Sequence, residues 1–210
     1  MKTSRTSTAN WAKLFINLDD DVIRSSYHEL IRFYNEGHRQ YHNLNHINNC
    51  LEVFDQVKKL CEDPNAVEIA IWCHDIIYDP TRQDNEEKSA QWIFDILSTA
   101  KTPIQNAAHI ARLIKATCSH TSYDTDSQIL NDIDFSILGA PIAEYHSYSQ
   151  AIRKEYSHVP DNVYIPARQG VLQKILSRKP IFNTPHFVNM YERSTRRNLE
   201  NEIRSLESSL

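Results

Sequence analysis

Signals for the start of a helix recur along the chain, and they constrain its fold more than any other feature. Each signal is a capping side chain followed by proline at the first helical position, as at Asp63-Pro64, Thr102-Pro103 and Thr184-Pro185. Apolar residues also recur at helical spacing, as they do in the segment 44–61, which ends just before the first of these signals. No segment alternates apolar and polar residues between glycine turns in the way of a half-buried strand. We therefore predict an all-α protein of roughly ten helices.

Other residues mark further helix boundaries. Asp84 or Asn85 is expected to cap a helix that has Glu86 in its first turn, where the helix dipole favours a carboxylate. Gly139 is expected just after a helix end, a position at which glycine commonly takes the left-handed conformation. Further helices are expected after Pro141 and after Asp161.

Length and composition limit the domain organisation and the partners. A chain of 210 residues fits one domain over 1–210, with a core at about 25–180 on which a C-terminal helix, 185–208, packs. The net charge of −4 provides no basic surface for nucleic acid, and no apolar run reaches the ~20 residues of a membrane span. The four cysteines form no CxxC pair and the first residues resemble no signal peptide, so we expect a cytoplasmic protein.

The segment AIWCHDIIYDP, residues 70–80, places a histidine and an aspartate side by side in an apolar helical run. Burying two such ionisable groups costs several kcal/mol unless other groups pair with them. His46, at the start of one helix, and Asp134, in a later apolar helix, are the candidate partners of His74 and Asp75. Two imidazoles and two carboxylates suit a divalent cation that keeps positions open for water and substrate. Because adjacent helical residues point about 100° apart, the pair can share one ion only near a helix end, which Asp79-Pro80 indicates.

The order of His46, His74-Asp75 and Asp134 resembles the H…HD…D signature of the HD superfamily of metal-dependent phosphohydrolases. The likeness extends to a subgroup of predicted HD phosphohydrolases and covers nearly the whole chain. The segments that carry it are 39–47, 70–80, 84–90, 116–120, 132–141 and 152–156, and more weakly 164–172, 181–185 and 196–202.

The resemblance implies an all-helical fold that holds a divalent metal, with manganese, magnesium, nickel, iron and cobalt all found in such sites. It also implies an enzyme that hydrolyses a phosphoester or phosphoanhydride of a small phosphorylated substrate, often a nucleotide. The mixed imidazole and carboxylate ligands suit Mn²⁺ or another transition metal better than Mg²⁺ alone. The three glycines of the chain form no phosphate-binding loop, so side chains or the metal would hold the phosphate.

Two carboxylates are candidates for accepting a proton from the attacking water. Asp79 is expected one helical turn beyond Asp75, where it can face the same cleft, and the stretch resembles the alarmone hydrolases, in which acidic residues shortly after the HD pair have this role. Glu86 is the second candidate, although a first-turn carboxylate also stabilises a helix without catalysing anything. The candidate substrate-binding residues are Arg39, His42, His120, Arg153 and Arg168.

Three alternatives stay open at this stage. The final ligand is Asp134 or Asp132, which lie two residues apart on one helix and cannot both face the metal; the resemblance favours Asp134. His109 and His120 allow a di-iron oxygenase of the HD fold, in which extra histidines between the HD pair and the final aspartate bind a second iron. The third alternative is a non-catalytic HD module that keeps its metal and binds a ligand without turning it over.

Overall fold

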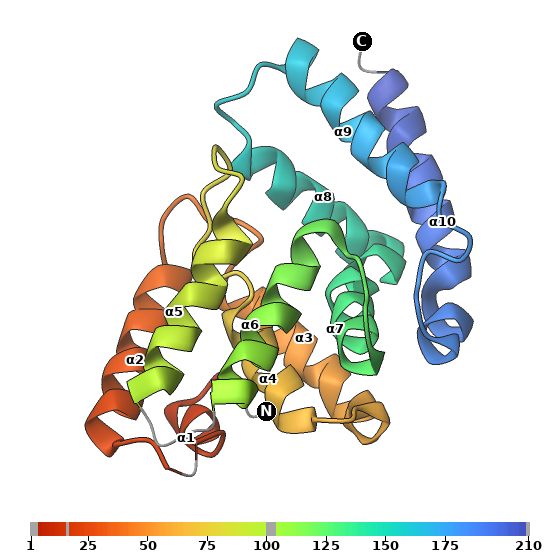
Figure 1. The fold of residues 1–210 in the computed structure, drawn as a ribbon. Coiled ribbons are helices and arrows are strands. Elements are labelled where there is room, and N and C mark those ends of the chain that lie inside the picture. The colour runs from red at the N-terminus through yellow and green to blue at the C-terminus, as the bar shows by residue number, and fades with distance from the viewer. Residues whose placement is uncertain (1–3, 16, 100–103, 209–210) are drawn as a thin grey trace. The chain divides into compact units, whose positions relative to one another are not determined.

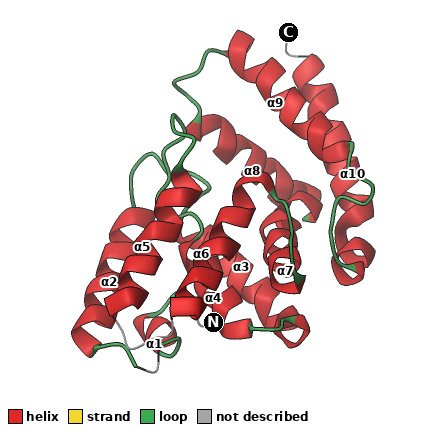
Figure 2. Ribbon diagram, viewed as in Figure 1, coloured by secondary structure: helices red, strands yellow, loops and turns green. Residues whose placement is uncertain are grey.

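The computed structural model describes residues 4–15, 17–99 and 104–208, and every regular element in these ranges is a helix (Figures 1 and 2). The α-helices are α1 (Thr8–Ala12), α2 (Asp20–Tyr34), α3 (Leu44–Val57), α4 (Pro64–Cys73), α5 (Asn85–Thr99), α6 (Ile104–Ser119), α7 (Thr125–Phe135), α8 (Ile142–Glu155), α9 (Asp161–Leu176) and α10 (Pro185–Glu207). Two short 3₁₀ helices are η1 (Lys58–Leu60) and η2 (Ser136–Gly139). The predicted all-α fold and the number of helices are confirmed.

The predicted helix starts agree closely with the observed ones. The Asp63 side chain accepts a hydrogen bond from the Ala66 amide at 2.9 Å, and Pro64 is the first residue of α4. α10 also begins with a proline, Pro185, after Thr184, although the Thr184 side chain makes no capping hydrogen bond. Asp84 precedes the first residue of α5, and its carbonyl accepts the Lys88 amide at 3.0 Å. Thr102-Pro103 lies outside the described residues.

The contacts between residues divide the chain into two compact units, 1–133 and 134–210, which we describe separately. The predicted single domain over 1–210 stays a prediction. In the first unit, α4 packs against α3, α5 and α6. Seven of its ten residues are buried because almost its whole circumference is apolar. A helix buried on all sides carries the residue at its end, His74, into the interior.

In the second unit, α10 packs against α9 and η2. Its buried apolar face includes Phe187 and Leu199. The same helix contributes Glu202, which accepts hydrogen bonds from Arg168 Nε on α9 at 2.8 Å and from the Tyr145 hydroxyl on α8. This buried polar network connects the three long helices of the second unit.

The prediction for Gly139 is wrong. Among the described residues no glycine has a positive φ, and Gly139 is the last residue of η2. A Cβ atom there would lie 2.7 Å from Tyr191 Cβ and 2.9 Å from Thr195 Oγ1, both on α10. Glycine is therefore needed for the close approach of η2 to α10, and not for a left-handed helix end.

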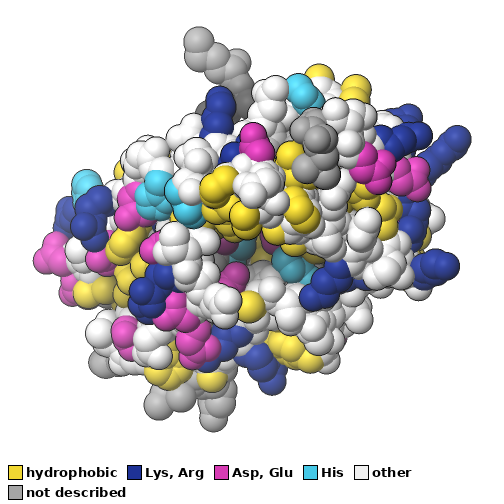
Figure 3. Space-filling view, turned by 90° about the horizontal axis from the view of Figure 1, so that it is seen from above, with side chains coloured by type: hydrophobic (Ala, Val, Ile, Leu, Met, Phe, Trp, Pro, Cys, Tyr) yellow, Lys and Arg dark blue, Asp and Glu magenta, His cyan; other side chains and the backbone are white. Residues whose placement is uncertain are grey.

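None of the helices formed by residues 4–15, 17–99 and 104–208 is long and apolar enough to cross a membrane. Figure 3 shows both basic and acidic side chains on the face that it draws. The expectation that nucleic acid is not a partner stays a prediction.

Gly139→Ala should destabilise the second unit by about 1–3 kcal/mol, because α10 must shift to admit the added methyl group. Gly170→Ala is the matched control, since an added Cβ on α9 meets nothing within 4 Å and alanine favours a helix by about 0.5–1 kcal/mol over glycine. Urea unfolding followed by circular dichroism measures both. Equal stability of the two variants would contradict this account of the η2–α10 packing.

Candidate metal centre

Two helix ends of the first unit bring the predicted ligands together. α3 begins at Leu44 after Asn43, whose side chain accepts the Asn45 amide, so His46 lies in the first turn on the buried face. α4 ends at Cys73, and His74 is its capping residue. The prediction that the His74-Asp75 pair lies near a helix end is therefore confirmed. Beyond the helix end, adjacent side chains no longer have to point about 100° apart, so both can point toward one ion.

Three potential ligand atoms form a nearly equilateral triangle. His46 Nε2 lies 3.2 Å from His74 Nε2, His74 Nε2 lies 3.2 Å from Asp75 Oδ2, and the remaining edge, from His46 Nε2 to Asp75 Oδ2, is 3.4 Å. Both histidines are at most 3% exposed. These three side chains form one group, within the first unit, that could hold a metal ion.

The chemistry of the three atoms fits a divalent cation. Ligand atoms about 2.1 Å from an ion are separated by edges of about 3.0 Å in an octahedron and about 3.4 Å in a tetrahedron, and the three observed edges lie in this range. Asp75 Oδ2 is buried, and both imidazole nitrogens lie at ion-pair distance from it. His74 Nδ1 lies 2.9 Å from the Ile71 carbonyl oxygen, to which it donates, so in the neutral ring Nε2 carries the lone pair that a metal ion would need.

The Asp75 carboxylate is ionised in this environment. Burial opposes its charge, but the nearby rings of His74, His46 and His42 outweigh that effect and hold the pKa of Asp75 well below its usual value. Burial, and then the negative charge of Asp75, raises the pKa of the Tyr34 hydroxyl well above its usual value. A buried carboxylate of this kind requires positive charge beside it, which a protonated ring or a cation can supply.

The two candidates for the fourth ligand lie on α7. Asp132 is only 1% exposed and belongs to no group of three potential ligands in the part of the chain that the structure describes. Asp134 lies in the last turn of α7 and is the first residue of the second unit. Asp134 remains the predicted fourth ligand.

The structure does not support the reason for choosing Asp79. Residues 74–84 contain no α-helix, so Asp79 is not one helical turn beyond Asp75, and that expectation is wrong. Asp79 Oδ1 accepts hydrogen bonds from the Thr81 hydroxyl at 2.7 Å and the Thr81 amide at 2.9 Å. These bonds lower the pKa of Asp79, which weakens it as a base at neutral pH. Its catalytic role stays a prediction.

Glu86 and His120 lie at two neighbouring helix ends. Glu86 is in the first turn of α5, where it approaches the Cys118 thiol of α6; burial, and then the charge of Glu86, raises the pKa of that thiol. His120 directly follows α6 and has a φ of +50°, the left-handed conformation that usually selects glycine after a helix. The roles predicted for both residues stay predictions.

The two arginines of the second unit are engaged inside that unit. Arg168 forms a buried ion pair with Glu202, at 2.8 Å. Arg153 donates to Asp161 at 2.7 Å and to the carbonyl oxygens of Tyr156 and Val159, and so closes the connection from α8 to α9. Both side chains therefore connect helices of the second unit to one another. Their contacts lend no support to the phosphate-binding roles predicted for them.

His109 does not join the triangle. Its Nε2 lies 3.6 Å from Asp126 Oδ2, and its Nδ1 accepts from Arg112 at 3.3 Å. Asp126 in turn accepts the amides of Glu62 and Asp63, at 2.7 and 2.9 Å, and so holds the chain ahead of α4. The described part of the chain thus offers no group of three ligands that includes His109.

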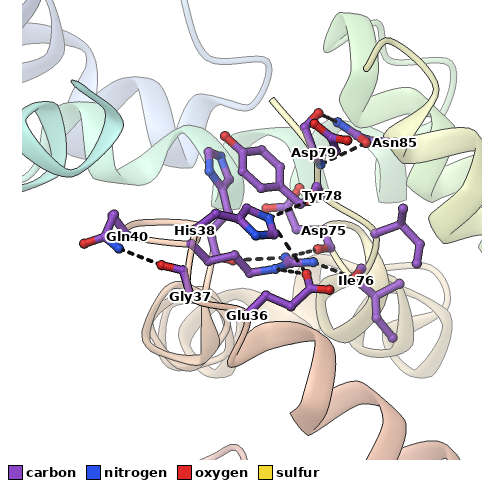
Figure 4. A network of polar contacts seen from close by, with 12 residues as sticks. Glu36, Gly37, His38, Gln40, Asp75, Ile76, Tyr78, Asp79 and Asn85 are labelled. Carbon is purple, nitrogen blue, oxygen red and sulfur yellow. Dashed lines mark hydrogen bonds and ion pairs between the residues drawn. The ribbon is translucent and has the colours of Figure 1, made fainter. Parts of the chain in front are cut away.

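Around the triangle, sequence reasoning missed a set of side chains that hold the backbone after α4. Residues 75–79 have no regular structure, and the side chains of Arg39 and Ser89 bond to their backbone. The side chains of His38 and Asn85 do the same (Figure 4). His42 stacks on the Tyr78 ring at 4.2 Å between centroids. The signal for Ser89 and Asn85 was their spacing of four residues at the start of α5, with Ser89 fully buried.

Comparison of the chain with protein-family models, with curated proteins and with solved structures gives no match in any of the three. The resemblance to the HD superfamily therefore stays a prediction from the residues.

Co²⁺ or Mn²⁺ should raise the unfolding temperature of the wild-type protein, because an ion bound only by the folded chain stabilises it by about 2.7 kcal/mol at a hundredfold excess over its Kd. His46→Ala and His74→Ala remove a triangle atom and should abolish this shift. His109→Ala is the control and should keep it, since that ring contacts Asp126. If neither ion changed the unfolding temperature of the wild-type protein, the assignment of the triangle as a metal site would be wrong.

Glu202→Gln should lower the free energy of unfolding at pH 7 by about 3 kcal/mol, because it leaves the Arg168 charge buried without a carboxylate. Burial opposes the ionisation of Glu202, but the hydrogen bonds and charge of Arg168 outweigh it and lower the pKa of Glu202. The stabilisation is therefore present above the unfolded pKa of about 4.3 and is lost on acidification through the lower folded value. The gap between variant and wild type, measured by urea unfolding, should narrow from pH 5 to pH 3; a constant gap would contradict the ion pair.

Proposed function

We propose that the protein is a metal-dependent phosphohydrolase that cleaves a phosphoester or phosphoanhydride of a small molecule of the nucleotide class. The observation that carries the proposal is the triangle of His46 Nε2, His74 Nε2 and Asp75 Oδ2, in which a buried carboxylate oxygen faces two buried imidazole nitrogens. The ordered H…HD…D residues support the same reaction class by resemblance, with Asp134 as the fourth ligand.

A divalent cation held by these residues would supply Lewis acidity, lowering the pKa of a water and drawing charge from a phosphoryl oxygen. Mixed nitrogen and oxygen ligands favour Mn²⁺ or another transition ion, among Mn, Mg, Ni, Co and Fe. The triangle uses only three protein atoms, which leaves room in a six-coordinate site for oxygen atoms of the substrate.

The chain's own residues would orient the ligands, accept a proton and contact the phosphate. Asp75 supplies negative charge beside the two imidazoles, and the carbonyl oxygen of Ile71 orients the His74 ring. Asp79, part-buried and ionised, is proposed to accept the proton of the attacking water through the carboxylate that also accepts from Thr81. His42, whose ring centroid lies 6.0 Å from that of His46, is close enough to the centre to donate to a phosphate oxygen.

The other two functions are less well supported. The di-iron oxygenase requires extra histidine ligands, and His109 is instead engaged with Asp126 and Arg112. A non-catalytic metal-holding module is compatible with the triangle alone, and only turnover separates it from the enzyme. We therefore keep the phosphohydrolase as the single proposed function.

The test is a phosphate-release screen with Mn²⁺, Mg²⁺, Co²⁺ and Ni²⁺ across nucleoside mono-, di- and triphosphates, cyclic nucleotides and alarmones, coupled to a phosphatase where the direct product is not free phosphate. Metal-dependent release from at least one class is expected, and His74→Ala should abolish it. The absence of turnover from every class, with a protein that binds the ion, would contradict the enzymatic proposal and favour the non-catalytic module.

In the same assay, Asp79→Asn should lower kcat about 10²–10⁴-fold, the range that a general base contributes, while Co²⁺ affinity stays unchanged. Asp95→Asn, on the exposed face of α5, is the matched control and should retain wild-type turnover. If Asp79→Asn is as active as this control, another group accepts the proton.

A further inference from the structure

The backbone of residues 75–79, a segment that starts at the aspartate of the HD pair, is bonded by side chains from other segments of the first unit. Ser89 Oγ accepts the Ile77 amide at 3.1 Å, and Asn85 both accepts the Asp79 amide at 3.2 Å and donates to the Asp79 carbonyl oxygen at 2.9 Å. His38 Nε2 lies 2.9 Å from the Tyr78 carbonyl oxygen (Figure 4). Few backbone–backbone hydrogen bonds hold this irregular, half-buried segment, among them the Ile76 amide to the Cys73 carbonyl oxygen at 3.1 Å, so its remaining backbone groups need such partners.

Arg39 makes the largest contribution to this set. Its side chain is fully buried, and its guanidinium donates to the Asp75 carbonyl oxygen at 2.6 Å and to the Ile76 carbonyl oxygen at 2.8 Å. Another N–H reaches the His42 carbonyl oxygen at 3.1 Å, and Nε donates to Glu36 at 3.0 Å (Figure 4).

These contacts connect the two segments that carry the triangle. The His42 carbonyl precedes α3, on which His46 lies, and the Asp75 and Ile76 carbonyls follow His74 directly. One planar group thus joins the loop before the first ligand to the turn that contains the other two. A lysine cannot reproduce this, since its ammonium is a single point of attachment whereas the guanidinium is a rigid fork.

We propose that Arg39 is a positioning residue that sets the distance between His46 and the His74-Asp75 pair, and that it does not contact the substrate phosphate. The inference rests on the proposed function, because it takes the triangle to be a metal site. It replaces the substrate-binding role that the sequence suggested for Arg39, since four hydrogen bonds hold the guanidinium inside the protein.

Arg39→Lys and Arg39→Met should each weaken Co²⁺ binding about 10–100-fold in a visible-absorption titration, the usual cost of losing a group that orients metal ligands. Arg32→Lys and Arg32→Met are the matched controls, because that side chain is 70% exposed on α2 and should leave Co²⁺ affinity unchanged. Inorganic phosphate is titrated against all four variants. Unchanged Co²⁺ affinity with weaker phosphate binding in the Arg39 variants would overturn the proposal in favour of direct contact.

Hydrogen–deuterium exchange gives a readout that needs no metal. Arg39→Lys should speed exchange in peptides covering 74–79 and leave peptides of α6 as in the wild type. Faster exchange throughout the first unit, or no change at 74–79, would overturn the positioning role. A wild-type protein that binds no Co²⁺ would contradict the proposed function instead, and the exchange result would still decide whether Arg39 holds this turn.

Discussion

The interaction on which the rest of the structure depends is the contact of an ionised, buried carboxylate with two buried imidazoles. Asp75 Oδ2 is buried and lies 3.2 and 3.4 Å from the Nε2 atoms of His74 and His46. Such an arrangement is costly in an apolar interior unless positive charge occupies it. The surrounding residues bring these three atoms together and hold them in place.

Two features of the first unit meet that requirement. The almost wholly apolar α4 places His74 in the interior, and side chains from elsewhere in the first unit bond to the backbone of the irregular segment after it. Arg39 is central because it touches the backbone on both sides of the centre. Side chains bonded to backbone carbonyls specify a shape more strictly than apolar packing does, since each bond has a direction.

Local signals predicted much of this, and non-local contacts account for the failures. Helix starts at Pro64 and Pro185 could be read from the sequence because a cap and a proline act within a few residues. The meeting of His46 with the His74-Asp75 pair was predicted from the cost of burial. Gly139 was misread because its reason is a contact with Tyr191, about 50 residues later. Arg39 and Arg168 were predicted to bind substrate because the carbonyl oxygens and the glutamate that they contact cannot be identified from the sequence.

The most direct measurement is an anomalous-difference map from crystals of the protein soaked in Mn²⁺. The account predicts one strong peak about 2.1 Å from His46 Nε2, His74 Nε2 and a carboxylate oxygen of Asp75. A map in which those three side chains bond only to one another and to water, with manganese elsewhere or nowhere, would contradict it.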